Sequence, residues 1–249
     1  MSLADVTSAN IVGYNTVTIK AGKYNMFAVN FENVSDTDGI SIQDLIPGTT
    51  EGLFGGTAAT GDQIQIYNSE TGNYKNFYLQ YSTVPLLMKN NWKWIDGTAV
   101  ASYKFKSGDS FWYRSRGSTD VTVSLAGGVS LAPAQTIEIV EGYNMIGNAF
   151  PVNFNPNSLG TSYWESSGAV GGTAATGDQI QIFNPETGNY KNYYLQYSTV
   201  PLLMKNNWKW IDGTTPVDAA AEVMSVGKGA WYRHRGTGFT LTIASPIAK

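Results

Sequence analysis

The sequence predicts an all-β chain of two tandem homologous domains, each an antiparallel β-sandwich or partly open barrel of about seven strands. The first observation behind this is an internal repeat: residues 55–98 return at residues 171–214 with three changes in 44 positions. The changes are Tyr67 to Phe183, Ser69 to Pro185 and Phe77 to Tyr193. An offset of 116 residues (171 − 55) is about the length of one small domain. We therefore expect domains at residues 1–128 and 129–249.

The second observation is a hydrophobic period of two, which places one face of a strand on a core and the other in water. In the first copy, this period is found at Val17 and Ile19, at Ile64 and Ile66, and at Val121, Val123 and Leu125. In the second copy, it is found at Ile137 and Ile139 and at Phe239, Leu241 and Ile243. Segments 24–31, 74–80, 92–96 and 111–116 have equally strand-like compositions. Only residues 41–46 suggest a helix, and a short one.

The third observation is turn chemistry. Asn68-Ser69-Glu70-Thr71-Gly72 lies between two strand patterns, and Gly72 can take the left-handed conformation that closes a hairpin. The second copy has Pro185 in place of Ser69, at a position where a type I turn already requires the φ of proline. The segment therefore predicts a β-hairpin in both copies.

The amino-acid composition argues against several classes of partner and favours one cellular location. The net charge is −3 with no basic run, which argues against nucleic acid or anionic lipid as a partner. No apolar run approaches the roughly 18 residues that suggest a membrane span. The chain has no cysteine, which favours export and leaves no thiolate for a zinc site or a nucleophile. We expect a secreted or cell-surface protein whose targeting segment has been replaced by a short leader at Met1-Ser2-Leu3.

Each copy resembles a β-rich repeat that is common in exported bacterial surface and matrix proteins. The matching residues are Gly22, Tyr24, Asn25 and Met26, then Ile64–Asn68, then Gly108, Phe111, Trp112 and Tyr113, and finally Val121–Leu125. The opening is Gly-Trp-Asn in those repeats and has tyrosine in this chain. The resemblance covers most of both copies and implies export and a surface or matrix role, with no catalytic residues and no cofactor.

Candidates for catalysis have simpler interpretations. His234 is the single histidine, and Ser115 takes its place in the first copy, so we interpret it as a packed or surface residue. Paired carboxylates can hydrolyse glycosides. The repeated ones lie at turns and strand ends, where we expect structural roles: Asp62 and Asp178, Glu70 and Glu186, and Asp96 and Asp212. We therefore expect no enzymatic activity.

A weak calcium candidate lies in a loop of the first copy. Asp36 and Asp38 present two carboxylates at a spacing suited to oxygen ligation. The glutamate that completes an EF-hand loop is missing, and the second copy has residues 153–158 there instead. A solvated loop is the favoured interpretation, and we expect no metal.

Aromatic pairs offer a candidate for ligand binding. On a strand, Trp92 and Trp94 share one face, as do Trp208 and Trp210. Exposed rings of this kind would stack on sugars, whereas buried ones would fill a sandwich core, which is the favoured interpretation for a Trp-Lys-Trp strand. The candidate glycan site also includes tyrosines that share a face of the preceding strand: Tyr74 and Tyr78, and Tyr190 and Tyr194.

A second aromatic cluster carries arginines. The pattern Trp112-x-Arg114-x-Arg116 returns as Trp231-x-Arg233-x-Arg235, which on a strand predicts a cation–π ladder. Such a ladder is either a stacked surface or a binding site for an acidic partner.

Taken together, the sequence favours a non-enzymatic structural or interaction protein of a bacterial surface, matrix or repetitive assembly, with self-association or a surface glycan as its partner. A carbohydrate-binding module is the alternative.

Overall fold

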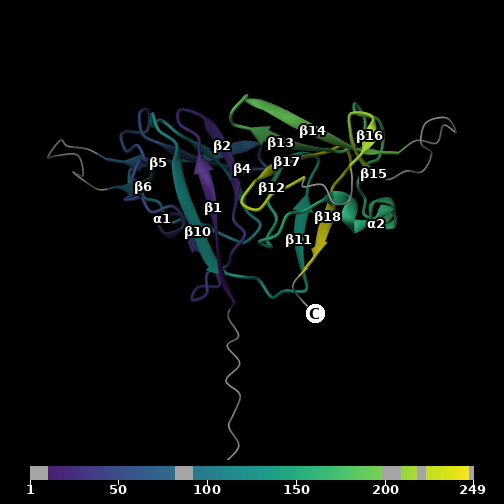
Figure 1. Ribbon diagram of the computed structural model, residues 1–249, viewed down its shortest axis with the longest axis horizontal. Helices are drawn as coiled ribbons and strands as arrows, with labels where there is room; N and C mark the ends of the chain where they lie inside the picture. The colour runs from purple at the N-terminus through teal and green to yellow at the C-terminus, as the bar shows by residue number, and fades with distance from the viewer. Residues whose placement is uncertain (1–10, 82–91, 198–208, 218–222, 247–249) are drawn as a thin grey trace, which may run out of the picture.

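The computed structural model describes residues 11–81, 92–197, 209–217 and 223–246. The two repeats lie side by side along the long axis of the molecule, the first coloured purple to teal and the second teal to yellow (Figure 1). In each repeat the larger sheet lies above a smaller two-stranded sheet, β1 and β10 in one half and β11 and β18 in the other (Figure 1).

The first repeat is organised around a six-stranded antiparallel sheet with the order β2-β9-β4-β5-β6-β7. Two smaller sheets pair β1 with β10 and β3 with β8. The strands are β1 (Val12–Ile19), β2 (Tyr24–Ala28), β3 (Ile40–Ser41), β4 (Gln63–Asn68), β5 (Asn73–Gln80), β6 (Lys93–Asp96), β7 (Ala99–Val100), β8 (Lys104–Phe105), β9 (Ser110–Arg114) and β10 (Val121–Gly128).

The second repeat has the same large sheet, in the order β12-β17-β13-β14-β15-β16, and a small sheet of β11 and β18. Its strands are β11 (Ala134–Ile139), β12 (Gly142–Ile146), β13 (Gln179–Asn184), β14 (Asn189–Gln196), β15 (Lys209–Asp212), β16 (Thr215–Pro216), β17 (Ala230–His234) and β18 (Phe239–Ala244). Apart from the two-residue strands β3, β7, β8 and β16, each repeat has seven strands in the described residues. The all-β prediction is confirmed, and the open sheets agree with its sandwich alternative.

The predicted hairpin is present in both repeats. Asn68 pairs with Asn73 across the turn, and Gly72 has a φ of 69°. The side chain of Asn68 accepts a hydrogen bond from the backbone N–H of Thr71 at 2.9 Å, which is the local bond that favours asparagine at this position. Gly188 in the second repeat has a φ of 71°.

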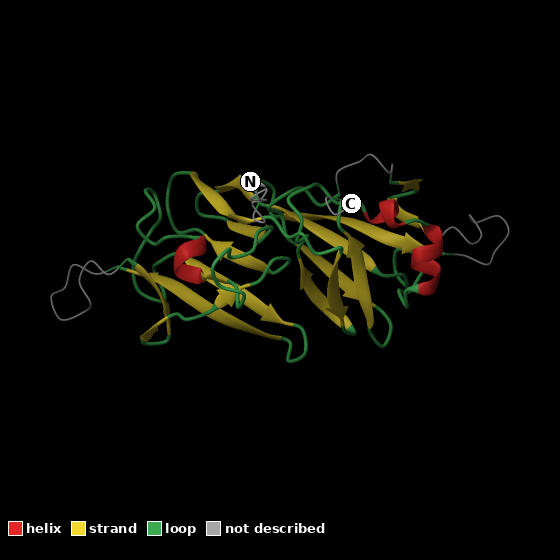
Figure 2. Cartoon of the chain, turned by 90° about the horizontal axis from the view of Figure 1, so that it is seen from below, coloured by secondary structure: helices red, strands yellow, loops and turns green. Residues whose placement is uncertain are grey.

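Helices are few and short (Figure 2). The predicted one is α1 (Ile42–Leu45), which Ser41 caps by accepting a hydrogen bond from the N–H of Asp44. The prediction missed η1 (Pro156–Leu159) and α2 (Thr161–Ser166) in the second repeat. Asn155 caps η1 and Pro156 begins it, so the sequence did contain the usual start signal of a helix.

Each repeat has its own hydrophobic core. Every buried member of the first core lies between Val17 and Leu125, and every buried member of the second lies between Ile139 and Ile243. Burial of these side chains is the main stabilising contribution within each repeat. None of the helices in the described part of the chain is long and apolar enough to cross a membrane.

The two repeats also pack against each other, through contacts that are reciprocal. The backbone N–H of Ala28 donates to the carbonyl of Gly227, and the equivalent N–H of Gly147 donates to the carbonyl of Gly108, both at 3.0 Å. Such a pair of matching bonds is typical of a two-fold related interface. The repeats therefore associate as two subunits of a symmetric dimer would, within one chain.

A candidate binding site between the repeats

A cluster of aromatic and methionine side chains lies at the centre of the contact between the repeats. Trp112 on β9 meets Phe183 on β13 edge to face, with ring centroids 4.9 Å apart. Trp231 on β17 meets Tyr67 on β4 in the same way at 5.0 Å. Met26 and both tryptophans are buried here, in a third core that is distinct from the cores of the repeats. The contact thus repeats itself about an approximate two-fold axis.

Two hollows open beside this cluster, and we call them the twin grooves. They have volumes of about 300 and 290 Å³, at the small end of the range for small-molecule sites (~300–1,000 Å³). The first is lined by Tyr24, Gln65, Tyr74, Trp112, Phe183 and Tyr190. The second is lined by the equivalent set, Tyr143, Gln181, Tyr190, Trp231, Tyr67 and Tyr74. Tyr74 and Tyr190 belong to both, so the grooves are contiguous, and each needs residues of both repeats.

The strand register explains why these side chains meet. On β9, Trp112 lies opposite Met26 on β2 and Gln65 on β4, so all three project from one face of the six-stranded sheet. The other face, which includes Phe111 and Tyr113, is packed in the core of the first repeat. Each twin groove therefore lies on the sheet face that the core leaves uncovered.

The tyrosines of the grooves are partly exposed. Tyr24, Tyr74, Tyr143 and Tyr190 are 39%, 44%, 40% and 41% exposed, so each has ring surface available to a ligand. Burial raises the pKa of Tyr74 and of Tyr190 above the ordinary tyrosine value. Both hydroxyls are therefore neutral near pH 7 and able to donate.

Glutamine amides add polar groups to the grooves. The amide nitrogen of Gln65 donates to Gln63, whose own amide nitrogen donates to the carbonyl of Ala58. The second repeat has the same chain of bonds, with Gln181 donating to Gln179 at 3.0 Å. An amide has two N–H donors and one oxygen acceptor, so an N–H and the oxygen of each groove glutamine remain for a ligand.

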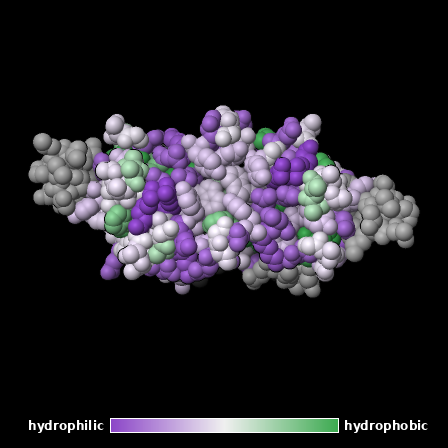
Figure 3. All heavy atoms as spheres, turned by 90° about the horizontal axis from the view of Figure 1, so that it is seen from above, coloured by the Kyte–Doolittle hydropathy of each residue, from purple (hydrophilic) through white to green (hydrophobic). Residues whose placement is uncertain are grey.

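Viewed from above, the surface of the molecule is of intermediate hydropathy at its centre and has strongly hydrophilic areas to either side (Figure 3).

The predicted cation–π ladder takes a different form. Arg114 lies 5.2 Å above the ring of Tyr24, and Arg233 lies 5.2 Å above the ring of Tyr143. The prediction of guanidinium on indole is wrong for both, because the tryptophans turn into the contact between the repeats and each arginine stacks on the tyrosine opposite it on the neighbouring strand. Arg116 and Arg235 lie beyond the ends of β9 and β17, and their backbone N–H groups donate to the carboxylates of Asp62 and Asp178.

The predicted tryptophan platform is not a surface. Trp94 and Trp210 are fully buried in the cores, which corrects their inclusion as ligand-binding residues and agrees with the favoured core interpretation. The indole N–H of Trp94 donates to the carbonyl of Ile46 at 2.7 Å. Trp92 is half-buried and stacks on Tyr81 with centroids 4.2 Å apart. Trp208 lies outside the described residues.

The predicted tyrosines separate into two groups. Tyr74 and Tyr190 line both grooves. Tyr78 and Tyr194 are half-buried and lie on the same sheet faces, four residues further along each strand, and they line neither groove.

The repeated carboxylates have structural partners. Asp62 and Asp178 are buried rather than at a solvated edge, and each accepts a hydrogen bond from a buried tyrosine, Tyr113 at 2.7 Å and Tyr232 at 2.8 Å. The imidazole Nδ1 of His234 lies 2.9 Å from Asp178, and His234 is only 2% exposed, as expected for a packed residue.

The remaining repeated carboxylates are near the surface. Asp96 pairs with Lys75 at 3.0 Å and Asp212 with Lys191 at 2.8 Å. Glu186 pairs with Lys20 of the first repeat at 2.6 Å. Glu70 is exposed in its turn, as predicted.

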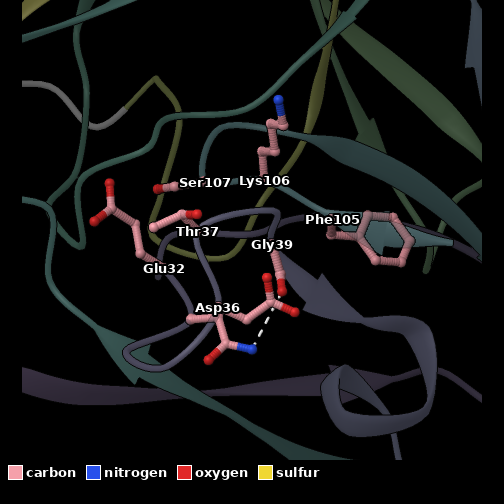
Figure 4. A pocket seen from close by; sticks show the side chains of 8 residues that line it. Glu32, Asp36, Thr37, Gly39, Phe105, Lys106 and Ser107 are labelled. Carbon is pink, nitrogen blue, oxygen red and sulfur yellow. Dashed lines mark hydrogen bonds between the residues drawn. The ribbon is translucent and has the colours of Figure 1, made fainter.

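A hollow of about 410 Å³ lies beside the loop that contains the calcium candidates. The Nζ of Lys104 lies 2.6 Å from Asp36 and 3.6 Å from Asp38, so an ammonium group already pairs with both carboxylates. The side chains of Glu32 and Asp36 do not point toward one another (Figure 4). The described residues contain no group of three or more potential metal ligands. The carboxylates described beside this hollow are therefore not arranged as a set of metal ligands.

Sequence reasoning missed four pairs of groove residues: Tyr24 and Tyr143, Gln65 and Gln181, Tyr67 and Phe183, and the tryptophans Trp112 and Trp231, which it had assigned to the ladder. One signal was available. Tyr24 and Tyr143 match although they lie outside the nearly identical block, in flanks that have diverged. Comparisons with protein-family models, curated proteins and solved structures found no match.

Proposed function

We propose that this chain is a non-enzymatic glycan-binding protein of a bacterial surface or matrix, and that the twin grooves are its binding site. The observation that carries the proposal is the repetition of one set of aromatic and amide side chains in both grooves. The proposal develops the carbohydrate-binding alternative, with the site moved from the Trp-x-Trp strands to the contact between the repeats.

The chemistry of the grooves suits a sugar. A pyranose ring has apolar C–H faces and a rim of hydroxyl groups. Partly exposed rings such as Tyr24 and Tyr74 supply flat apolar area, and their hydroxyls supply polar contacts. The amides of Gln65 and Gln181 can donate to a sugar hydroxyl and accept from one. Because the rings are held by the packing between the repeats, little side-chain entropy is lost on binding.

The carboxylates support a role without catalysis. Glycoside hydrolysis needs two carboxyl groups on either side of a bond in one cleft. Among the residues that the structure describes, no aspartate or glutamate lines either groove. Asp62 and Asp178 are enclosed in the cores by their hydrogen bonds.

The test is a titration of the protein with soluble neutral and acidic oligosaccharides. Binding is measured by the change in tryptophan fluorescence and by calorimetry. Trp112 and Trp231 line the grooves, so binding should change their emission. Tyr190→Ala should weaken binding about five- to tenfold, because an aromatic contact of this kind contributes about 1–1.5 kcal/mol.

The matched control is Tyr14→Ala, which removes a tyrosine that is 76% exposed and lines neither groove. It should bind like the unaltered protein. Failure of every oligosaccharide to bind, or an equal loss in Tyr14→Ala and Tyr190→Ala, would refute the proposal.

A further inference from the structure

The chain has only four arginines, two in each repeat, and one arginine of each pair lies beside a twin groove. They are Arg114 and Arg116 in the first repeat and Arg233 and Arg235 at the equivalent positions of the second. Arg114 ends β9, two residues after the groove residue Trp112, and Arg233 lies on β17 two residues after the groove residue Trp231. Both pairs lie outside the nearly identical block.

The contacts place the first arginine of each pair next to its groove. Arg114 lies opposite Tyr24 in the sheet and stacks on its ring at 5.2 Å. Tyr24 is itself part of the groove wall. Arg233 and Tyr143 repeat this arrangement at the other groove. A ligand that extends from a groove along the sheet face would therefore meet a guanidinium group directly after the tyrosine.

The arginines also lack acidic partners among the residues that the structure describes. The ion pairs found there use lysines and His234, with Lys20, Lys75, Lys104 and Lys191 each bound to a carboxylate, and none uses an arginine. Within the described part of the chain, the positive charges of Arg114 and Arg233 are thus left without a carboxylate that neutralises them. The Nε atoms of Arg116 and Arg235 are buried without a hydrogen-bond partner within the same residues.

We propose that Arg114 and Arg233 bind anionic groups of the glycan, so that the ligand is an acidic polysaccharide carrying carboxylate or sulfate groups. This inference rests on the proposed function. A guanidinium group binds either anion through two parallel hydrogen bonds. Two separate positive sites on a chain of net charge −3 fit a polymer with widely spaced charges better than the dense phosphates of a nucleic acid.

The experiment compares an oligosaccharide of uronic acids with its carboxyl-reduced, neutral counterpart and with a sulfated oligosaccharide of the same length. The unaltered protein should bind at least one acidic oligosaccharide about tenfold or more tightly than the neutral one at low salt. The advantage should shrink as salt is added, because salt screens exposed charges. The two acidic ligands then distinguish carboxylate from sulfate.

The variants test which residues are responsible. Arg114→Gln/Arg233→Gln should remove the preference for the acidic ligand and keep binding of the neutral one. Arg114→Lys/Arg233→Lys should keep part of the preference, since the charge remains but the bidentate geometry is lost. Lys106→Gln is the matched control, because it removes an exposed positive charge that lies beside a different hollow.

Three results would overturn the inference: equal affinity for acidic and neutral ligands, a preference that survives the double glutamine substitution, or a single-stranded oligonucleotide that binds more tightly than any of the sugars. Binding of neutral and acidic sugars with equal affinity would leave the proposed function standing. Failure of all glycans to bind would remove both.

Discussion

Gly147 is the most informative position for testing whether the two repeats form one unit. It lies in the contact between them, where its N–H donates to the carbonyl of Gly108 at 3.0 Å. A Cβ atom added at Gly147 would lie 2.6 Å from the Cβ of Ala28 and 2.9 Å from the carbonyl oxygen of Gly108. These neighbours are a methyl group and backbone, which cannot rotate away, so Gly147→Ala must push the repeats apart.

The size of the effect follows from two opposing contributions. Overpacking of a well-packed contact costs about 1–3 kcal/mol. The alanine reduces the conformational freedom of the unfolded chain, which stabilises by about 0.4–1 kcal/mol. The net expectation is a loss of about 1–2 kcal/mol, or a factor of roughly 5–30 in the folded-to-unfolded ratio.

The assay is denaturant unfolding monitored by tryptophan emission, since Trp112 and Trp231 lie in the contact between the repeats. Gly117→Ala is the matched control, because a Cβ there would meet nothing closer than the carbonyl oxygen of Gly52 at 3.5 Å. The control should raise the midpoint slightly, whereas Gly147→Ala should lower it. Gly147→Ala should also weaken glycan binding, since both grooves need residues of both repeats. A midpoint for Gly147→Ala at or above that of Gly117→Ala would refute this reasoning.

Three further predictions concern the cores. Trp94→Phe should destabilise the protein by about 1 kcal/mol more than Trp210→Phe, because the indole N–H of Trp94 donates to a carbonyl at 2.7 Å whereas that of Trp210 has no partner in the described residues. Equal losses in thermal unfolding would contradict this. Asp178→Asn should lower the free energy of unfolding by about 3 kcal/mol or more. The carboxylate accepts hydrogen bonds from the hydroxyl of Tyr232 and from two backbone N–H groups, whereas the NH₂ group of an amide would face one of these donors and could not accept from it. A variant with unchanged stability would argue against this network. Burial raises the pKa of Tyr113 and Tyr232 well above 10.0, so above that pH the native state holds more protons than the unfolded chain. The free energy of unfolding should then fall as the pH rises, and tyrosinate absorbance should show these groups ionising only as the protein unfolds, not before.

Much of the fold could be predicted because its signals are local. The alternation at Val17 and Ile19, for example, identifies a strand whose inward side chains are both buried. The turn before Gly72 required no knowledge of distant residues. The helices after Asn155 were missed, although their capping signal is equally local, because segments of four and six residues are too short to display a helical period.

The candidate site could be predicted only in part. The period of two identifies the residues that share a face of a strand, but it does not say what covers that face. Trp94 and Trp112 are both tryptophans on strands, yet one is enclosed by the core of its own repeat and the other by the second repeat.

By itself, the sequence determined the duplication, the class of fold, the strands and the hairpins, because backbone pairing and alternating burial depend on neighbouring residues. Only the tertiary structure decided that the repeats meet face to face through Trp112 and Trp231 and that Tyr74 and Tyr190 join in one pair of grooves. The physical reason is that packing between two folded surfaces depends on their shapes, to which residues far apart in the chain contribute together.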